Sequence, residues 1–536
     1  MPIYDALHDE PSIKTIAVKH EENAAVMADV YGRLTGEPGV CLVTAGPGAT
    51  NSVTGVAQAF AASSPLVHIS GTVSGSDELF HGVGGDPLFL QEMFQRITKW
   101  SDRIESPDRI QSATMKAFEL ASAGRKGPIH IEIPLRVQRA ECELRQIKPV
   151  YPRPKIDRNS LIRAQSVIAR AQQYVIFAGE EVLRYSASSE LLELAETIRA
   201  PVVVSDSSID AFPHDHPLFA GYLPGNYDGP YRNPIVQTAV KKADLMLLVG
   251  ARLEAPETSI ILSLGPKKCV NITSERTSHR VRVPMINVVG NIARSLTTLV
   301  ELVGSSQQKK RPESSLLQDL AQQKQMISEA LERIISDKVT ASPIHPGLVA
   351  ATVRRLTDRH AIIATDVGTH AIWVRDYFHA YEPNTYLETG NYGSMGFALP
   401  AAIAAKLVRP EQQVVAVTGD GGFLMSLADL PTAVENRLNI VVVVMNDSKY
   451  GMIWRMQGEE YRGRHIGVDL APSNFASLAQ SFGAAGVRID DPRDLAPALR
   501  EALTDDKMTV IDVLTDHRPD YACREIFKHT PSQAGS

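Results

Sequence analysis

The sequence predicts an α/β protein built from three consecutive units, each containing a parallel β-sheet. Short β-branched apolar runs alternate with segments of helical apolar spacing along most of the chain, which is typical of strands joined by crossover helices. Two polar stretches without periodicity interrupt this alternation, at about residues 140–159 and 305–315. We therefore expect domains at residues 1–139, 160–304 and 316–525, and a disordered tail over residues 530–536.

Each unit contributes its own strand and helix patterns. The first predicts strands at residues 16–18, 40–44, 66–70 and 129–133, with helices at 21–34 and 50–62. The second predicts strands at 174–178, 202–204, 245–249 and 270–272. The third predicts strands at 414–418 and 440–445, with a helix at 427–438 between them.

The composition excludes several classes of protein. Of the 536 residues, 44% are hydrophobic and 22% are charged, and the net charge is −6, so no general affinity for nucleic acid is expected. The four cysteines lack Cys-x-x-Cys spacing, which favours a reducing compartment and argues against a zinc site. We find no secretory signal and no apolar run long enough to span a bilayer, and we expect a cytoplasmic protein without membrane partners.

Residues 414–452 carry the clearest chemical signal. Asp420 lies in a Gly-Asp-Gly-Gly turn directly after one strand pattern, and Asp447 directly follows the next. Both turns should lie at the carboxyl ends of neighbouring parallel strands, where open α/β sheets bind ligands. Two carboxylates and a carbonyl, for which we propose Lys449, suit Mg²⁺ that also binds a diphosphate. The sequence lacks a P-loop.

This segment resembles the thiamine diphosphate motif, which begins Gly-Asp-Gly and ends with Asn-Asn or Asn-Asp. Residues 19–55 in turn resemble the pyrimidine-binding domain of the acetolactate synthase-like family, with K-H-E-E-N-A-A-V-M-A-D-V-Y-G-R followed by T-A-G-P-G-A-T-N. By position, the resemblance implies that Glu21 hydrogen-bonds the aminopyrimidine and activates the cofactor. It also implies a Rossmann-like middle domain and a diphosphate-binding third domain.

The resemblance continues at residues 89–92, 97–99, 127–128, 366–370 and 393–402. The catalytic residues that we predict are Glu21, His81 and Gln91. The cofactor-binding residues that we predict are Glu21, Pro47, Asn51, Gly368, Thr369, His370, Gly393, Met395, Gly419, Asp420, Gly421, Gly422, Asp447, Tyr450, Gly451 and Met452. Among these, Met395 matches the apolar residue that bends the cofactor.

The chain also departs from the family pattern. The strand and Pro-Gly-Gly loop that precede P-I-Y-D-A-L in relatives are missing, which indicates a shortened start or a domain without that edge element. Flavin-containing relatives have an arginine where this chain has Pro256, and the lysine of their P-K-D-V is replaced in Pro134-Leu135-Arg136-Val137. These changes argue against bound FAD and against the biosynthetic acetolactate reaction.

The resemblance implies a thiamine diphosphate- and Mg²⁺-dependent carboligase. It would decarboxylate a 2-oxo acid, with pyruvate favoured, and ligate the enamine to a second carbonyl. The resemblance also implies a homo-oligomer, a dimer or a dimer of dimers, whose active sites are shared between two chains. His81 is the lone histidine of the loop near the first domain's site, and it is either an exposed loop residue or a proton donor.

Other functions stay open at this point. A 2-oxo acid decarboxylase of the benzoylformate or phenylpyruvate type would use the same residues. A cofactor-binding paralogue without catalysis is a second alternative, although Glu21 argues against it. A nicotinamide dehydrogenase is disfavoured because no G-x-G-x-x-G follows a predicted strand.

Overall fold

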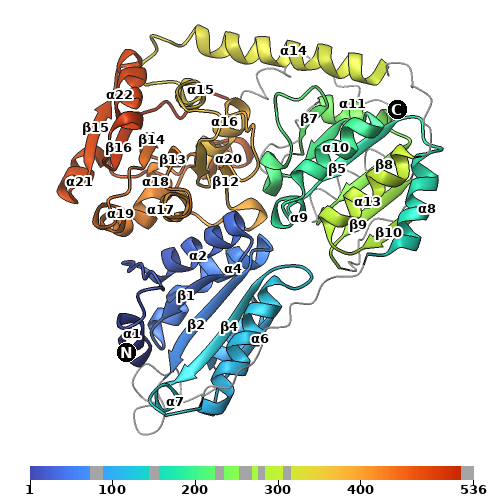
Figure 1. Cartoon of the computed structure of the whole chain (residues 1–536). Coiled ribbons are helices and arrows are strands. Elements are labelled where there is room, and N and C mark those ends of the chain that lie inside the picture. Colours follow the sequence, from blue (N-terminus) through green and yellow to red (C-terminus); the bar gives the residue numbers. More distant parts are fainter. Residues whose placement is uncertain are drawn as a thin grey trace.

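Three separate parallel β-sheets form the framework of the chain (Figure 1). The computed structural model describes residues 1–72, 89–143, 156–223, 234–252, 268–275, 284–305 and 315–520. The strand orders are β1-β2-β4-β3, β10-β9-β8-β5-β6-β7 and β12-β11-β13-β14-β16-β15. The predicted α/β class with three parallel sheets is confirmed, while the predicted domain limits stay a proposal.

The first sheet forms the lower lobe in Figure 1. Its strands are β1 (Gly39–Val43), β2 (Leu66–Thr72), β3 (Trp100–Arg103) and β4 (Pro128–Pro134). Its helices are α1 (Pro2–His8), α2 (Glu21–Thr35), α3 (Pro47–Asn51), α4 (Val53–Ala61), α5 (Phe89–Gln95), α6 (Ile110–Ser122) and α7 (Leu135–Gln138), with the short 3₁₀ turn η2 (Pro107–Arg109).

Two predictions for this lobe are wrong in detail. Residues 16–18 form no strand, because the apolar side chains of Ile16 and Val18 pack against the core of the third sheet instead of joining the first. The helix predicted over residues 50–62 is broken at Ser52 into α3 and α4. Apolar periodicity detects burial, but it does not say which sheet provides the buried surface.

The middle sheet lies beside the third one and is covered by helices on its faces (Figure 1). Its strands are β5 (Tyr174–Ala178), β6 (Val202–Val204), β7 (Phe219–Tyr222), β8 (Leu245–Val249), β9 (Cys269–Thr273) and β10 (Met285–Val289). Its helices are α8 (Arg158–Ile168), α9 (Glu181–Arg184), α10 (Ser188–Ile198), η3 (Asp206–Ala211), α11 (Pro234–Lys242) and α13 (Ile292–Gly304).

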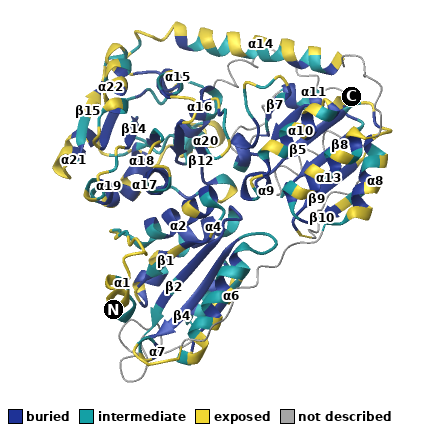
Figure 2. Ribbon diagram, viewed as in Figure 1, coloured by how far each residue is buried: buried dark blue, intermediate teal, exposed yellow. Residues whose placement is uncertain are grey.

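The long helix α14 (Ser315–Ser336) runs along the top from the middle sheet to the third and is exposed over much of its length (Figure 2). The third sheet contains β11 (Ile362–Thr365), β12 (Tyr386–Leu387), β13 (Val414–Gly419), β14 (Val441–Asn446), β15 (Ala485–Ile489) and β16 (Thr509–Leu514). Among the described residues, no helix has the length and apolarity needed to cross a membrane.

The helices and 3₁₀ turns of the third sheet cover both of its faces and connect its strands. They are α15 (Pro346–Leu356), α16 (Thr369–Tyr377), η5 (Gly390–Tyr392), α17 (Ala398–Val408), α18 (Asp420–Ser426), η6 (Leu427–Asp429), α19 (Leu430–Glu435), α20 (Gly451–Glu460), α21 (Phe475–Ser481) and α22 (Pro492–Thr504). The helix predicted over residues 427–438 is therefore replaced by η6 and α19. The Gly-Asp-Gly-Gly segment, in turn, starts a helix of its own, α18.

Helix α2 of the lower lobe packs directly against α17 of the third sheet (Figure 2). Val26, Val30 and Leu34 belong to the same apolar core as α17. The Arg33 guanidinium donates a 2.6 Å hydrogen bond to the carbonyl of Glu388, across the same contact. The first and third parts therefore share one core, which fixes the orientation of the helix that begins at Glu21.

Candidate active site

Three loops meet at the carboxyl ends of β11, β13 and β14. These strands are direct neighbours with parallel pairing, and Gly419 is in register with Met445. A Cβ atom built on Gly421 would lie 2.6 Å from the Tyr450 ring, and one built on Gly451 would lie 3.1 Å from Asp447 and from Thr369. The structure thus brings residues 368–370, 419–422 and 447–452 together as predicted, with glycines where larger residues would fill the space.

The buried Asp420 and the half-buried Asp447 form a carboxylate pair within this cluster. Asp420 Oδ1 accepts a 2.8 Å hydrogen bond from the N–H of Gly421, whereas its buried Oδ2 has no hydrogen-bond partner. Burial raises the pKa of Asp420 to about 6, and burial followed by the charge of Asp420 raises the pKa of Asp447 to about 7. Two desolvated carboxylates that repel each other favour a bound cation.

This carboxylate pair cannot complete a cation shell alone. Among the described residues, no group of three or more His, Cys, Asp or Glu side chains could hold a metal ion. The N–H of Lys449 donates to Asp447 Oδ1 at 3.0 Å, and its ammonium forms an ion pair with Asp469. The remaining ligands of a cation would therefore have to come from carbonyl groups, water or a bound anion, which suits Mg²⁺ with a diphosphate.

His370 and Asp366 organise the neighbouring loop. The Asp366 carboxylate accepts 3.0 Å hydrogen bonds from the N–H of Gly396, which fixes the turn beside Met395. His370 is buried next to Gly368 and Gly419, and its Nε2 has no hydrogen-bond partner. Burial lowers the pKa of His370 to about 4, so this imidazole is neutral and offers one ring nitrogen to a ligand.

A cavity that is partly open to solvent adjoins these loops. Gly368, Gly393 and Met452 line it together with Arg375 and Glu388. The Arg375 guanidinium lies 3.3 Å from the Glu388 carboxylate, and burial raises the pKa of Glu388 whereas the charge of Arg375 lowers it. A buried guanidinium–carboxylate pair therefore forms part of the cavity wall.

A second set of predicted residues meets in the lower lobe, at the carboxyl end of β1. Asn51 Nδ2 donates a 3.0 Å hydrogen bond to Glu21 Oε2. A Cβ atom on Gly48 would lie 3.2 Å from Glu21 Oε1, so the glutamate lies against the turn that follows Pro47. Neither Glu21 nor Asn51 lines the cavity beside Gly368 and Gly393.

Buried polar groups pack next to the Glu21–Asn51 pair in the interior of the lower lobe. Ser52, the residue after Asn51, hydrogen-bonds His68 Nε2 at 2.7 Å. The imidazole of His68 lies opposite that of His130 on the next strand, and Phe94 stacks on the His68 ring and contacts the His130 ring at a tilt. Ser101 links His130 to Gln91, because its hydroxyl contacts His130 Nδ1 at 2.8 Å and the Gln91 carbonyl at 3.0 Å.

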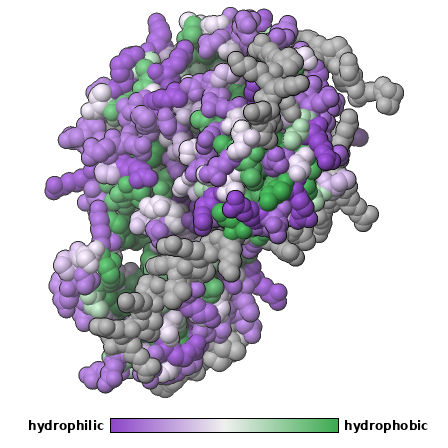
Figure 3. Space-filling view, turned by 45° about the vertical axis from the view of Figure 1, so that its right-hand side comes forward, coloured by the Kyte–Doolittle hydropathy of each residue, from purple (hydrophilic) through white to green (hydrophobic). Residues whose placement is uncertain are grey.

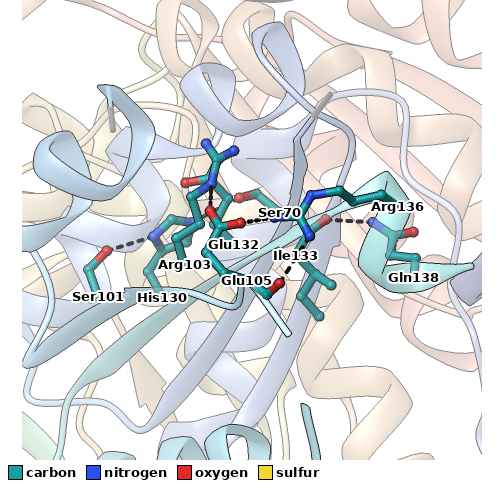
Figure 4. A network of polar contacts seen from close by, with 9 residues as sticks. All are labelled: Ser70, Ser101, Arg103, Glu105, His130, Glu132, Ile133, Arg136 and Gln138. Carbon is teal, nitrogen blue, oxygen red and sulfur yellow. Dashed lines mark hydrogen bonds and ion pairs between the residues drawn. The ribbon is translucent and has the colours of Figure 1, made fainter. Parts of the chain in front are cut away.

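A polar network extends along the carboxyl ends of β3 and β4 (Figure 4). Arg136, at the position where the family pattern P-K-D-V differs, donates to the carbonyl and the carboxylate of Glu105. Arg103 connects Glu105 to the buried Glu132, whose pKa is raised by burial. Arg136, which stands at the aspartate position of that pattern, is thus held by its own neighbours at this end of the sheet.

Two other predicted positions lie outside the described residues, namely His81 and Pro256. Sequence reasoning also missed functional candidates. Asp366 follows β11 directly and carried the strand-end signal that identified Asp420, yet we did not predict a role for it. Arg375 and Glu388 gave no local signal, because they are distant in the sequence and only the tertiary fold brings them together.

The architecture and the two residue sets define a class of protein. Two parallel α/β sheets each carry a set of strand-end residues, one with a carboxylate pair that suits Mg²⁺ and a diphosphate, the other with a glutamate–asparagine pair. This is the class of thiamine diphosphate-dependent enzymes. Three family models match the chain: the N-terminal binding domain of thiamine pyrophosphate enzymes over residues 1–100, their central domain over 161–299 and their C-terminal binding domain over 366–513.

Curated relatives match this sequence over almost the whole chain. A probable acetolactate synthase large subunit of Methanocaldococcus jannaschii is 32% identical, with 96% of this chain and 88% of the relative covered. The acetolactate synthase large subunit of Haemophilus influenzae and the isozyme 3 large subunit of Escherichia coli K12 are each 31% identical, with 96% and 90% covered. The chain belongs to the thiamine pyrophosphate enzyme family, and within it to the acetolactate synthase-like enzymes.

Proposed function

We propose that the protein decarboxylates a 2-oxo acid, with pyruvate favoured, and ligates the product to a second carbonyl compound. The observation that carries this proposal is the carboxylate pair of Asp420 and Asp447 among glycine-lined loops, together with Glu21 at the start of α2 in the lower lobe. When bound, thiamine diphosphate would supply a nucleophilic carbon for the keto group and would stabilise the negative charge of decarboxylation.

The third sheet would hold the diphosphate end. Asp420, Asp447 and the carbonyl of Lys449 would bind Mg²⁺, and His370 would offer its free ring nitrogen. The remaining residues of this half would contact the cofactor through backbone and side-chain groups: Gly368, Thr369, Gly393, Met395, Gly419, Gly421, Gly422, Tyr450, Gly451 and Met452. Fixed loops of this kind orient a reacting group without reorganisation during the reaction.

Glu21 would act on the pyrimidine end, beside Pro47. Its carboxylate would hold a proton at the ring nitrogen of the cofactor, and the hydrogen bond from Asn51 fixes the orientation of that carboxylate. Gln91 lies in the same lobe and remains a candidate for contact with substrate. The Ser101 hydroxyl donates a hydrogen bond to its backbone carbonyl and so fixes the position of this residue. Proton transfer by a carboxylate that is held in a fixed position is general acid–base catalysis.

We also propose that the active site is shared between two chains. The cavity at the third sheet is lined by residues of the middle and third parts, without Glu21 or Asn51. Leu424, Met425, Ile453 and Met456 on α18 and α20, which flank the carboxylate pair, are exposed apolar residues, and Figure 3 shows hydrophobic patches on a mostly hydrophilic surface. A second copy that covers α18 and α20 would bring its own Glu21 to the cofactor.

Product analysis tests the reaction. Purified protein supplied with thiamine diphosphate, Mg²⁺ and pyruvate should yield acetolactate. Acetaldehyde as the main product would instead support the alternative, a 2-oxo acid decarboxylase. Absence of CO₂ release from pyruvate and from aromatic 2-oxo acids would support a cofactor-binding paralogue without catalysis.

We propose that FAD is not tightly bound, because Pro256 stands where flavin-containing relatives have an arginine. The absorption spectrum of the purified protein tests this directly. A stoichiometric flavin band would show that the substitution does not exclude the flavin.

A further inference from the structure

One buried carboxylate of the third part, Asp429, holds the segment of the lower lobe that carries Glu21. Asp429 has no exposed surface. Its Oδ1 accepts a 2.7 Å hydrogen bond from the N–H of Lys19, and its Oδ2 accepts a 2.5 Å hydrogen bond from Asn23 Nδ2. These two donors lie on either side of Glu21, so the contact spans the first turn of α2.

The carboxylate is itself fixed from the other side. The Thr432 hydroxyl donates a 2.7 Å hydrogen bond to Asp429 Oδ1 and also reaches the carbonyl of Ala17 at 3.4 Å. A buried carboxylate with donors on both oxygens has one preferred position. By contrast, the ion pair between Lys19 and Glu435, which joins the same two segments, is solvent-exposed and weak.

We propose that Asp429 is a positioning residue for Glu21. It does not touch the cofactor or the substrate. It sets where α2 begins, and Glu21 is the first residue of that helix. This inference rests on the proposed function, in which the Glu21 carboxylate must lie within hydrogen-bonding distance of the cofactor, and a misplacement of about 1 Å can cost on the order of 10²-fold in rate.

Asp429→Asn tests the inference because asparagine keeps the shape but removes the negative charge that strengthens the hydrogen bonds from the Lys19 N–H and the Asn23 amide. We expect the dissociation constant for thiamine diphosphate with Mg²⁺ to stay within about twofold of the wild type, since Asp420 and Asp447 are intact. We expect proton exchange at C2 of the bound cofactor to slow by about tenfold or more.

A second readout does not need the cofactor. In the protein without thiamine diphosphate, amide hydrogen exchange of residues 19–23 should be faster in Asp429→Asn than in the wild type. Glu435→Gln is the matched control, because it removes only the exposed ion pair between the same segments, and it should behave as the wild type in both measurements. Asn23→Ala removes the other partner of the same hydrogen bond, on the side of the lower lobe. It should also slow C2 exchange relative to the wild type, so the test remains decisive if Asp429→Asn folds poorly.

Mixed oligomers distinguish two roles for Asp429: positioning Glu21 of its own chain, or acting on the metal site through α18. In a mixture of Glu21→Gln and Asp420→Ala chains, the one intact site uses Glu21 from the Asp420→Ala chain. Adding Asp429→Asn to that chain should abolish most of the restored activity, whereas adding it to the Glu21→Gln chain should not. Equal losses on both chains would overturn the inference, because Asp429 would then act through α18 and the metal.

Failure of the inference and failure of the proposed function give different results. Wild-type C2 exchange in Asp429→Asn and Asn23→Ala, with exchange lost in Glu21→Gln, overturns the role of Asp429 and leaves the function intact. Wild-type C2 exchange in Glu21→Gln overturns the proposed role of Glu21, and the role of Asp429 with it.

Discussion

At the scale of single residues, burial decides what the carboxylates and imidazoles of this protein can do. Asp420 is buried and the neighbouring Asp447 is half-buried, so each loses favourable hydration in its charged form. A divalent cation with a diphosphate would compensate both charges at once. Metal binding and cofactor binding should therefore depend on each other.

Asp447→Ala should abolish retention of thiamine diphosphate and leave the fold intact, because the variant removes one of the two carboxylates that would hold the cation. The measurement is the amount of cofactor that stays with the protein through gel filtration in the presence of Mg²⁺. Asp469→Asn is a suitable control, since this nearby carboxylate is exposed and forms an ion pair with Lys449. Stoichiometric cofactor on Asp447→Ala would contradict the assignment.

Buried histidines predict a loss of stability in mild acid. Burial lowers the pKa of His68 to about 3, and in the unfolded chain it titrates near 6.5. Between these values the unfolded state binds a proton that the folded state does not, so the free energy of unfolding falls as pH falls below about 6.5. At pH 5 the loss is about 2 kcal/mol for this residue, from roughly 1.4 kcal/mol per pH unit.

His68→Gln should remove this part of the pH dependence while its amide can still hydrogen-bond Ser52. Urea unfolding at pH 7.5 and at pH 5 gives the comparison, and the variant should lose less stability between the two than the wild type. Replacing the exposed His8 by Gln should leave the wild-type difference unchanged. If His68→Gln keeps the full difference, the low pKa of His68 is wrong.

At the scale of elements, close helix contact fixes the catalytic segment. Gly55 of α4 faces α2, and a Cβ atom there would lie 2.6 Å from the Ala25 Cβ and 2.8 Å from the carbonyl oxygen of Glu22. The backbone of α2 cannot easily move away from α4 at this position, because the opposite side of α2 packs against α17. The crossing of α2 and α4 therefore depends on glycine.

Gly55→Ala should destabilise the protein by about 1–3 kcal/mol, the usual cost of overpacking a close contact. The thermal midpoint measures the loss. Gly304→Ala is the matched control, because no heavy atom lies within 4 Å of a Cβ at the end of α13, and there alanine should be neutral or stabilising by up to about 1 kcal/mol. Equal midpoints for both variants would show that α4 can move away from α2.

At the scale of the whole molecule, the two halves of the proposed site lie on different sheets. Asp429 and the α2–α17 core hold Glu21 to the third part of its own chain, while the cavity beside Gly393 is lined without it. This arrangement fits an oligomer in which each chain supplies the glutamate for one site and the metal ligands for another.

Mixing two inactive variants tests the shared site. Glu21→Gln chains and Asp420→Ala chains should each be inactive alone, because each lacks one half of every site. After subunit exchange, a mixed dimer regains one intact site of two, so activity should return to at most about a quarter of the wild-type level in an equimolar random mixture. Exchange without any return of activity would contradict the shared site, and labelled subunits provide the proof of exchange.

The sequence by itself determined the α/β class, the central strands and the position of the carboxylate pair. These features are local: β-branched runs form buried strands, and glycine with aspartate at a strand end forms a turn that can hold an anion and a metal. Asp420 and Asp447 follow two strands that proved to be neighbours, so their proximity followed from chain order.

Only the tertiary structure decided which distant surfaces meet. Residues 16–18 pack on the third sheet instead of pairing with the first, and Asp429 binds the backbone of Lys19 from more than 400 residues away. Likewise, His68 and His130 lie side by side because β2 pairs with β4. Apolar spacing indicates that one face of a segment is buried. Which surface covers that face depends on loop closure and on the packing of whole domains, and no local pattern encodes either of these.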